Sequence, residues 1–333
     1  MRPSNKPFCR NGKIDIIIQD STLMKKFWGS TAMIIATILW GFAFSAQSSG
    51  VAIVEPILFT ALRSIVGVLA LIIVIAFFDL FREKRVTLWG KAETKEAKRE
   101  LLVGGWWCGF AISVACICQQ YGLKYISAGK TGFLTALYIV IVPLLGIFFK
   151  RKTSYTLWIA VALALSGSYL LCGGIDNIGI GEWFVIACAV LYSGHIMVID
   201  KYAAKCDCVR LSCIQFIIAT ILSAIASWLA GDPWIMDKII ASMPFWIFCG
   251  VGSSAIAFTL QMVSQKYLHP VTATLLMSLE SVFGVLGGWL FLNEILTTRE
   301  LLGCAVIFAG IILSQLPAEW FRKKLKTETY QEQ

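Results

Sequence analysis

Apolar stretches of about 20 residues recur along this whole chain, and each is long enough to cross the hydrocarbon core of a bilayer as a helix. Charged residues make up 15% of the sequence, whereas soluble proteins carry about a quarter. The stretches are continuously apolar and do not alternate, which excludes the strands of a transmembrane barrel. The sequence therefore predicts an all-α integral membrane protein without a soluble domain.

We expect ten membrane-spanning helices. Their predicted ranges are 28–48, 53–78, 101–121, 126–148, 155–174, 181–199, 210–230, 244–264, 271–292 and 300–317. The second range is longer than a bilayer requires, so this helix is expected to tilt or to extend beyond the hydrocarbon.

Basic residues predict the orientation of these helices, because cytoplasmic connections carry an excess of Lys and Arg. With both termini in the cytoplasm, 24 of the 29 Lys and Arg residues lie in or beside cytoplasmic segments and four lie on the outer side. The remaining one, Arg63, falls inside a span. The net charge of +9 thus reflects membrane topology. We expect a multi-pass protein of the cell membrane without a nucleic-acid partner.

The chain contains an internal repeat. Pairing 119–146 with 261–288, called the repeat alignment below, gives eight identities in 28 positions. The repeat unit holds five helices, and an odd number makes the second copy cross the membrane in the opposite direction. The sequence thus predicts two inverted five-helix repeats, an arrangement found in secondary transporters. The expected divisions are a cytoplasmic N-terminal extension at 1–27, a first repeat at 28–174, a second repeat at 181–317 and a basic cytoplasmic tail at 318–333.

Several motifs resemble those of the EamA family within the drug/metabolite transporter superfamily. They are LWG at 39–41, FTALRSIVGVLALI at 59–72, GLKYISAGKTGFLTALYIVIVPLLG at 122–146 and LESVFGVLGGWLFLNE at 279–294. In the last motif Ser281 replaces the usual proline and Asn293 the usual glycine. The resemblance covers roughly residues 28–317. It implies ten helices in two five-helix repeats, and export of amino acids, nucleosides, other metabolites or drugs.

Two ionisable residues lie near the middle of predicted spans, Arg63 and Glu280. Such a residue costs about 2.5–3.5 kcal/mol on insertion scales, so it normally faces the protein interior or a water-filled cavity. Both are candidates for substrate binding, and Glu280 is also a candidate for proton coupling. Two alternatives stay open: the side chains form a buried ion pair, or Glu280 is a static polar link between helices.

Aromatic residues in mid-span form a second set of substrate-binding candidates, since rings commonly wall the cavity for an amphipathic metabolite. Trp40 and Tyr192 are equivalent if the first and sixth spans align, and Tyr138 falls opposite Glu280 in the repeat alignment. His195 is a further candidate for proton coupling. Four glutamines toward helix ends are expected to serve as gates or in packing: Gln47, Gln119, Gln120 and Gln261. Ordinary interhelical packing is the alternative for the aromatic residues and His195.

The sequence predicts a secondary transporter that exports small metabolites, amino acids or related compounds, by alternating access. An uncoupled facilitator, a channel-like protein or a non-transporting scaffold stays open. An integral membrane enzyme is less favoured, because no cluster of His, Asp and Arg gathers near one membrane face, and no catalytic residue is assigned. No cofactor or metal is expected, since the CDC motif at 206–208 lacks the further ligands of a zinc site. A small-molecule substrate and the lipid bilayer are the expected partners.

Overall fold

The computed structural model describes residues 11–83, 86–87, 89–90, 92, 94–148, 150, 154–171, 178–292, 295 and 297–315. Every regular element within these ranges is a helix. Eight segments are long and apolar enough to cross a membrane: Leu23–Val51, Pro56–Phe81, Lys95–Tyr125, Ala128–Phe148, Ile180–Tyr202, Cys208–Ala230, Met243–Gln265 and Pro270–Phe291. The prediction of an all-α membrane protein is confirmed.

The elements divide between the two halves of the chain. The first half holds α1 (Asn11–Val51), α2 (Pro56–Glu83), α3 (Lys95–Tyr125), α4 (Ala128–Thr135), α5 (Tyr138–Phe148) and α6 (Tyr155–Leu171). The second half holds α7 (Ile180–Tyr202), α8 (Cys208–Ala230), α9 (Met236–Ala241), α10 (Met243–Phe248), the π-helix η1 (Cys249–Ala257), α11 (Phe258–Gln265), α12 (Pro270–Met277), α13 (Leu279–Leu292) and α14 (Thr298–Gln315). Helices α6 and α14 overlap the predicted spans 155–174 and 300–317, but neither is among the eight membrane-length segments.

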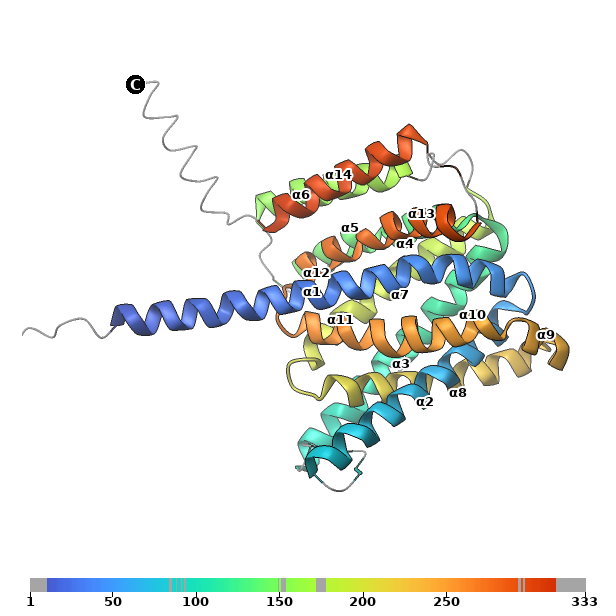
Figure 1. Ribbon diagram of the computed structural model, residues 1–333, viewed down its shortest axis with the longest axis horizontal. Coiled ribbons are helices and arrows are strands. Elements are labelled where there is room, and N and C mark those ends of the chain that lie inside the picture. Colours follow the sequence, from blue (N-terminus) through green and yellow to red (C-terminus); the bar gives the residue numbers. More distant parts are fainter. Residues whose placement is uncertain are drawn as a thin grey trace, which may run out of the picture.

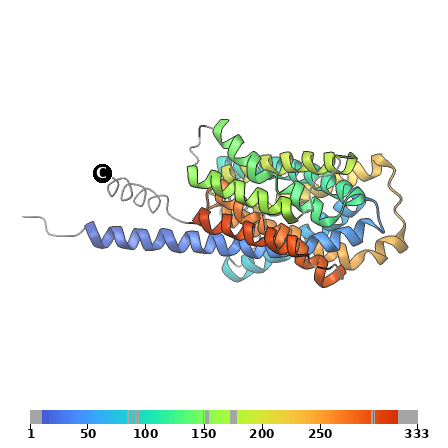
Figure 2. The ribbon, with the colours of Figure 1, turned by 90° about the horizontal axis from the view of Figure 1, so that it is seen from above.

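The first helix is longer than predicted. It begins at Asn11 rather than at residue 28, and its first part projects beyond the end of the bundle in both views (Figure 1, Figure 2). The sequence between Lys13 and Trp28 contains neither Gly nor Pro, so no residue there interrupts the helix. Its apolar, membrane-length portion starts at Leu23.

Polar side chains and one glycine set several helix ends. Asp207 accepts a hydrogen bond from Arg210 N at 2.9 Å at the start of α8, and Thr94 Oγ1 accepts one from Ala97 N at 3.1 Å at the start of α3. Each bond satisfies a backbone N–H that has no partner inside its own helix. Helix α8 ends at Gly231, whose φ of 72° is the left-handed conformation that favours glycine. These caps fix where the connections begin.

The predicted span 126–148 is divided into two helices. Helix α4 ends at Thr135 and α5 begins at Tyr138, and between them Ile139 N donates to Ala136 O at 2.9 Å, a tighter i→i+3 bond. One turn further on, Pro143 has no N–H to donate and its ring crowds the preceding turn. The two helices together still form one membrane-length segment, Ala128–Phe148, which agrees with the predicted span.

The predicted span 271–292 is divided at the equivalent place, although it contains no interior proline. In the repeat alignment, the first and last residues of α4 fall on the first and last residues of α12. Ser281 N donates to Ser278 O at 3.2 Å, which is the counterpart of the i→i+3 bond between α4 and α5. The hydroxyls of Ser278 and Thr274 donate to carbonyls three residues earlier, at 2.6 and 2.9 Å, and such back-bonding bends helices.

Helices from the two halves of the chain pack against one another. The main pairs are α6 with α14, α3 with α7, α2 with α8, α3 with α8 and α1 with α13, and η1 packs against both α1 and α2. Figure 1 shows α6 and α14 along one edge of the bundle and α2 and α8 along the opposite edge. The interrupted helices lie between these edges, so both halves enclose the centre of the bundle.

Two glycines bring α6 and α14 into backbone contact, and this contact supports a prediction. A Cβ at Gly167 would lie 2.7 Å from Gly303 O, so Gly167→Ala should force the helices apart and destabilise the fold by about 1–3 kcal/mol. The matched control is Gly194→Ala in α7, where an added Cβ meets nothing within 4 Å. Thermal unfolding in detergent should give a lower midpoint for Gly167→Ala and an unchanged or higher one for Gly194→Ala. Equal midpoints would contradict the close approach.

Candidate functional site

A small cavity lies at the centre of the bundle. Its volume is about 30 Å³, and its walls are Trp40, Phe44, Gln47, Arg63, Gln119, Thr135, Tyr138, Tyr192, Ser253, Phe258, Met277 and Glu280. The structure brings together all five residues predicted to bind substrate, namely Trp40, Arg63, Tyr138, Tyr192 and Glu280. Both halves of the chain contribute to the wall.

The interrupted helices meet at this cavity through one hydrogen bond. Tyr138 Oη donates to Glu280 Oε1 at 2.7 Å, and both side chains are buried, with 1% and 5% of their surface exposed. Tyr138 begins α5, and Glu280 is the second residue of α13. The two residues that the repeat alignment places opposite each other therefore touch across the centre. Because the backbone bends at both positions, the buried carboxyl group of Glu280 has a hydrogen-bond partner.

Arg63 reaches the cavity from α2 and is 2% exposed. Its Nη1 donates to Gln47 Oε1 at 2.7 Å, its Nη2 to Ser253 Oγ at 2.7 Å and its Nε to Ser254 Oγ at 3.2 Å. Gln120 Nε2 also donates to Gln47 Oε1. All three partners of the guanidinium are neutral, so the positive charge, which arginine keeps in proteins, has no counter-ion among the described residues.

Arg63 and Glu280 do not form the buried ion pair that sequence analysis left open as an alternative. Glu280 is hydrogen-bonded to Tyr138, and Arg63 to the amide and hydroxyl oxygens of α1 and η1. The two side chains face one cavity from different walls. A guanidinium and a carboxyl group are therefore both presented to whatever occupies the space between them.

Two of the four predicted glutamines line the cavity, Gln47 and Gln119. Gln119 Nε2 donates to Thr135 Oγ1 at 3.3 Å, and Gln261 Nε2 contacts Met277 Sδ at 3.8 Å. These two contacts are equivalent, since the repeat alignment pairs Gln119 with Gln261 and Thr135 with Met277. Gln120 lies behind the wall, on Gln47.

His195 does not line the cavity but lies behind two of its rings. Its ring centroid is 6.4 Å from that of Tyr192 and 5.8 Å from that of Phe258, and its Nε2 is 2.7 Å from Gln215 Oε1. The histidine is fully buried. Its predicted role in proton coupling thus requires transfer past the layer formed by Tyr192 and Phe258.

Five of the wall residues were not among the site residues predicted from the sequence: Phe44, Thr135, Ser253, Phe258 and Met277. Thr135 and Met277 are equivalent in the repeat alignment and lie one turn before Tyr138 and Glu280. The repeat alignment could therefore have predicted Thr135 and Met277 as wall residues. Ser253 belongs to the small residues of the π-helix η1, and π-helical turns are frequent at functional sites. Phe258 carries no sequence signal that separates it from the other phenylalanines.

The size of the cavity determines what it holds in this conformation. Ligand pockets usually have roughly 300–1,000 Å³, whereas this cavity of about 30 Å³ has room for water only. A metabolite enters only when the walls move. In this structure the cavity is thus closed to a metabolite.

No group of three or more His, Cys, Asp and Glu side chains that could hold a metal ion occurs in the described part of the chain. In the CDC motif, burial raises the pKa of the Cys206 thiol to about 11. A thiol with a raised pKa is a poorer nucleophile at neutral pH than an ordinary cysteine.

The shared acceptor Gln47 Oε1 supports a second prediction. Gln47→Leu removes the acceptor of both Arg63 Nη1 and Gln120 Nε2, and each buried donor left without a partner costs about 1–3 kcal/mol, more if charged. Gln119→Leu is the matched control, because it removes one long contact to Thr135. Thermal unfolding in detergent should lower the midpoint further for Gln47→Leu. A smaller effect than in the control would contradict the shared-acceptor geometry.

Comparison with known proteins identifies the family. The model of the EamA-like transporter family matches residues 27–173 and 179–316. An uncharacterized transporter of Archaeoglobus fulgidus is 24% identical over 300 residues, covering 88% of this chain and 87% of its own length. The uncharacterized transporter YwfM of Bacillus subtilis is 23% identical, covering 85% of this chain and 92% of its own length.

A solved crystal structure shares the fold. It superposes with a TM-score of 0.68 at 18% identity, covering 86% of this chain and 97% of the other. The family model spans most of the sequence in two matches, and the relatives named above are transporters. The chain is therefore a multi-pass membrane transporter that belongs to the EamA-like transporter family.

Proposed function

We propose that the protein is a secondary carrier that moves a small zwitterionic metabolite, an amino acid or a related compound, across the cytoplasmic membrane by alternating access. The observation that carries this proposal is the central cavity, which is lined by the buried Arg63 of one half and the buried Glu280 of the other. A guanidinium matches a substrate carboxylate, and a carboxylate matches a substrate ammonium. The rings of Trp40, Tyr192 and Phe258 supply apolar walls for the remainder of the substrate.

Alternating access requires two halves that move against each other, and ten spans in two inverted five-helix repeats would supply them. The family model matches the chain twice, and helices α4 and α12 have the same length and are interrupted at equivalent positions. Interrupted helices at mid-membrane are where carriers of this kind hold substrates. These observations support the repeat at residues 28–174 and 181–317, with α6 and α14 as the fifth and tenth spans.

The excess of Lys and Arg supports an orientation with both termini in the cytoplasm. The end of the bundle that holds the α2–α3 and α7–α8 connections, called the basic end below, is then the cytoplasmic end. Export is the direction that the family resemblance favours. Glu280 is the proposed proton-coupling residue because it lies on the cavity wall, and His195, behind that wall, is the second candidate.

Counterflow in proteoliposomes tests the proposal. Liposomes preloaded with an unlabelled amino acid should take up the labelled one saturably. Glu280→Gln and Arg63→Gln should each lower the initial rate at least tenfold, because a hydrogen bond to a charged group contributes about 1.5–3 kcal/mol. Glu300→Gln is the matched control, since Glu300 lies outside the cavity at the start of α14, where it accepts a hydrogen bond from Thr297 N at 2.7 Å. Its rate should equal that of the wild type.

The remaining outcomes separate the alternatives. Saturable exchange that a pH gradient does not change would identify a facilitator without proton coupling. Exchange of nucleosides but not of amino acids would overturn the proposed substrate class. Absence of flux for every metabolite tried would overturn the carrier and favour a scaffold or an enzyme.

A further inference from the structure

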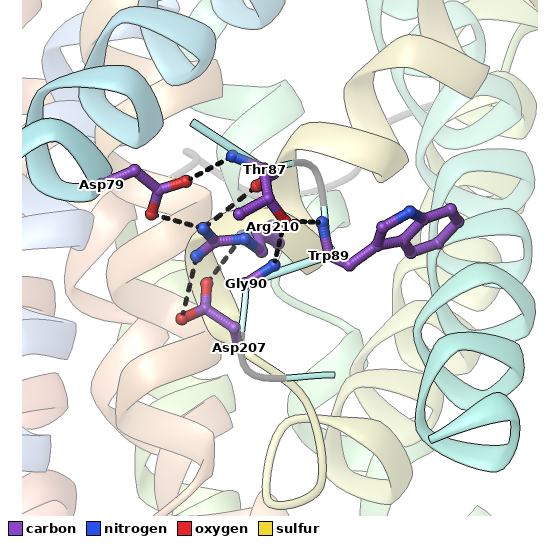
Figure 3. Close-up of polar contacts among 6 residues, drawn as sticks. All are labelled: Asp79, Thr87, Trp89, Gly90, Asp207 and Arg210. Atoms are coloured by element: carbon purple, nitrogen blue, oxygen red, sulfur yellow. Dashed lines mark hydrogen bonds and ion pairs between the residues drawn. The ribbon is translucent and has the colours of Figure 1, made fainter. Parts of the chain in front are cut away.

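The most extensive charged network among the described residues lies at the basic end, away from the cavity (Figure 3). Arg210, in the first turn of α8, donates from Nη2 to Asp79 Oδ1 of α2 at 2.5 Å and to Thr87 O at 3.2 Å. Its Nη1 lies 3.6 Å from Asp207 Oδ2. Asp79 Oδ2 in turn accepts a hydrogen bond from Thr87 N at 3.0 Å. One guanidinium thus joins the end of α2, the connection that follows it and the start of α8.

The position of Arg210 is unfavourable without these partners. The start of a helix carries a partial positive charge, which disfavours a cation in the first turn. The side chains of Arg210 and Asp79 are only 9% and 7% exposed, so water screens them little. Removing one member of a buried pair leaves the other charge without compensation. The two carboxylates of Asp79 and Asp207 are therefore what keeps the guanidinium in place.

The connection after α2 is shaped around this guanidinium. Gly90 has a φ of 52°, and a Cβ there would overlap the guanidinium of Arg210. Thr87 Oγ1 accepts hydrogen bonds from Trp89 N and Gly90 N, both at 3.1 Å. Lys98 of α3 lies 5.5 Å from the centre of the Trp89 ring. The ends of three helices are thus tied at one point.

The other ion pairs of the described chain differ from this one. Lys205–Glu100, also at the basic end, and Lys124–Glu55 have side chains that are 40–51% exposed, and such pairs contribute little. Lys130–Glu182 joins α4 to α7 at the opposite end. Among the described residues, only the pair of Asp79 and Arg210 joins α2 to α8. These helices are the second and seventh predicted spans, and they pack against each other across the two halves.

Of these two helices, only α2 contributes a residue to the wall of the cavity. Arg63 and Gln215 occupy the same position in α2 and α8, counted from the start of each helix, but only Arg63 lines the cavity. Gln215 is paired with His195 behind Phe258, and the Phe258 ring lies between Trp40, at 4.9 Å, and His195, at 5.8 Å. The Gln215 Nε2 and His195 Nδ1 atoms are buried without a partner. The wall residues Gln47, Arg63 and Gln119 lie near the ends of α1, α2 and α3 that face away from the basic end, so the cavity lies on that side of the bundle centre.

We propose that the Asp79–Arg210 pair is the lock that holds the basic end of the carrier shut in this conformation. When the pair separates, the first half of α8 moves away from α2, Phe258 is displaced, and Gln215 and His195 become the polar wall of a cavity open to the basic end. Gln215 then takes the place that Arg63 holds in the closed structure. This inference rests on the proposed alternating access, and it assigns a role to residues that touch no substrate.

Hydrogen exchange of the full chain in lipid nanodiscs tests the lock without any substrate. In Asp79→Asn, backbone amides at 194–202, 208–216 and 258–266 should exchange at least tenfold faster than in the wild type. Amides at the opposite end of the cavity, at 44–60 and 246–254, should exchange more slowly, because opening one end of a rocking carrier closes the other. The matched control is Glu100→Gln, the same chemical change in an exposed pair at the same end, which should stay within twofold of the wild type.

Opposite changes in exchange at the two ends distinguish a lock from a contact that only stabilises the fold. Faster exchange confined to 79–98 and 205–210, or faster exchange everywhere, would overturn the lock. Arg210→Gln should reproduce the Asp79→Asn pattern, and the double variant should add nothing to it. If both single variants fail to fold, Arg210→Lys keeps the charge but loses the planar fork and should give the same pattern at smaller amplitude; no change in it would overturn the lock. Wild-type counterflow tests the carrier separately, so failure of the lock leaves that result standing.

Discussion

In the hydrocarbon core of a membrane there is no water to satisfy a backbone N–H or C=O, so each span must satisfy its own. This constraint explains why the described chain is helical, and it also limits where a helix can bend. The two interruptions, between α4 and α5 and between α12 and α13, both lie in the interior of the bundle. There, i→i+3 hydrogen bonds and side-chain hydroxyl groups satisfy part of the backbone N–H and C=O groups that the interruptions leave without a helical partner. Because the bends are internal and equivalent, the side chains that start the second segments, Tyr138 and Glu280, face each other.

The buried charges follow from the same constraint. Arg63 finds neutral oxygens on α1 and η1, Glu280 finds a phenol, and Arg210 finds two carboxylates. The first two arrangements leave a guanidinium and a carboxyl group facing a shared cavity without an ionic partner, whereas in the third the protein itself supplies the opposite charge. A site that binds a charged ligand and a contact that holds helices together thus differ in whether the charge is compensated by the protein itself.

Much of the site could be predicted from the sequence, because Glu280 and Arg63 are conspicuous in apolar runs and Tyr138 follows from the internal repeat. The partners of Arg63 could not. Whether a guanidinium meets Glu280 or Gln47 depends on the rotation of α2 about its axis and on the π-helical register of η1, and neither is encoded by periodicity. The bend at Ser278 was missed because it arises from hydroxyl back-bonding rather than from proline. Asn293 and Glu294, the last two residues of the motif at 279–294, lie outside the described residues.

A cavity of about 30 Å³ between buried charges has a consequence for measured affinity. A protein that binds only in an open form has an apparent dissociation constant equal to the intrinsic one divided by the fraction of open molecules. The contacts offered by Arg63 and Glu280 therefore set only part of the affinity. The rest is set by how often the closed walls separate, so a substitution far from the cavity can tighten or weaken binding without touching the ligand.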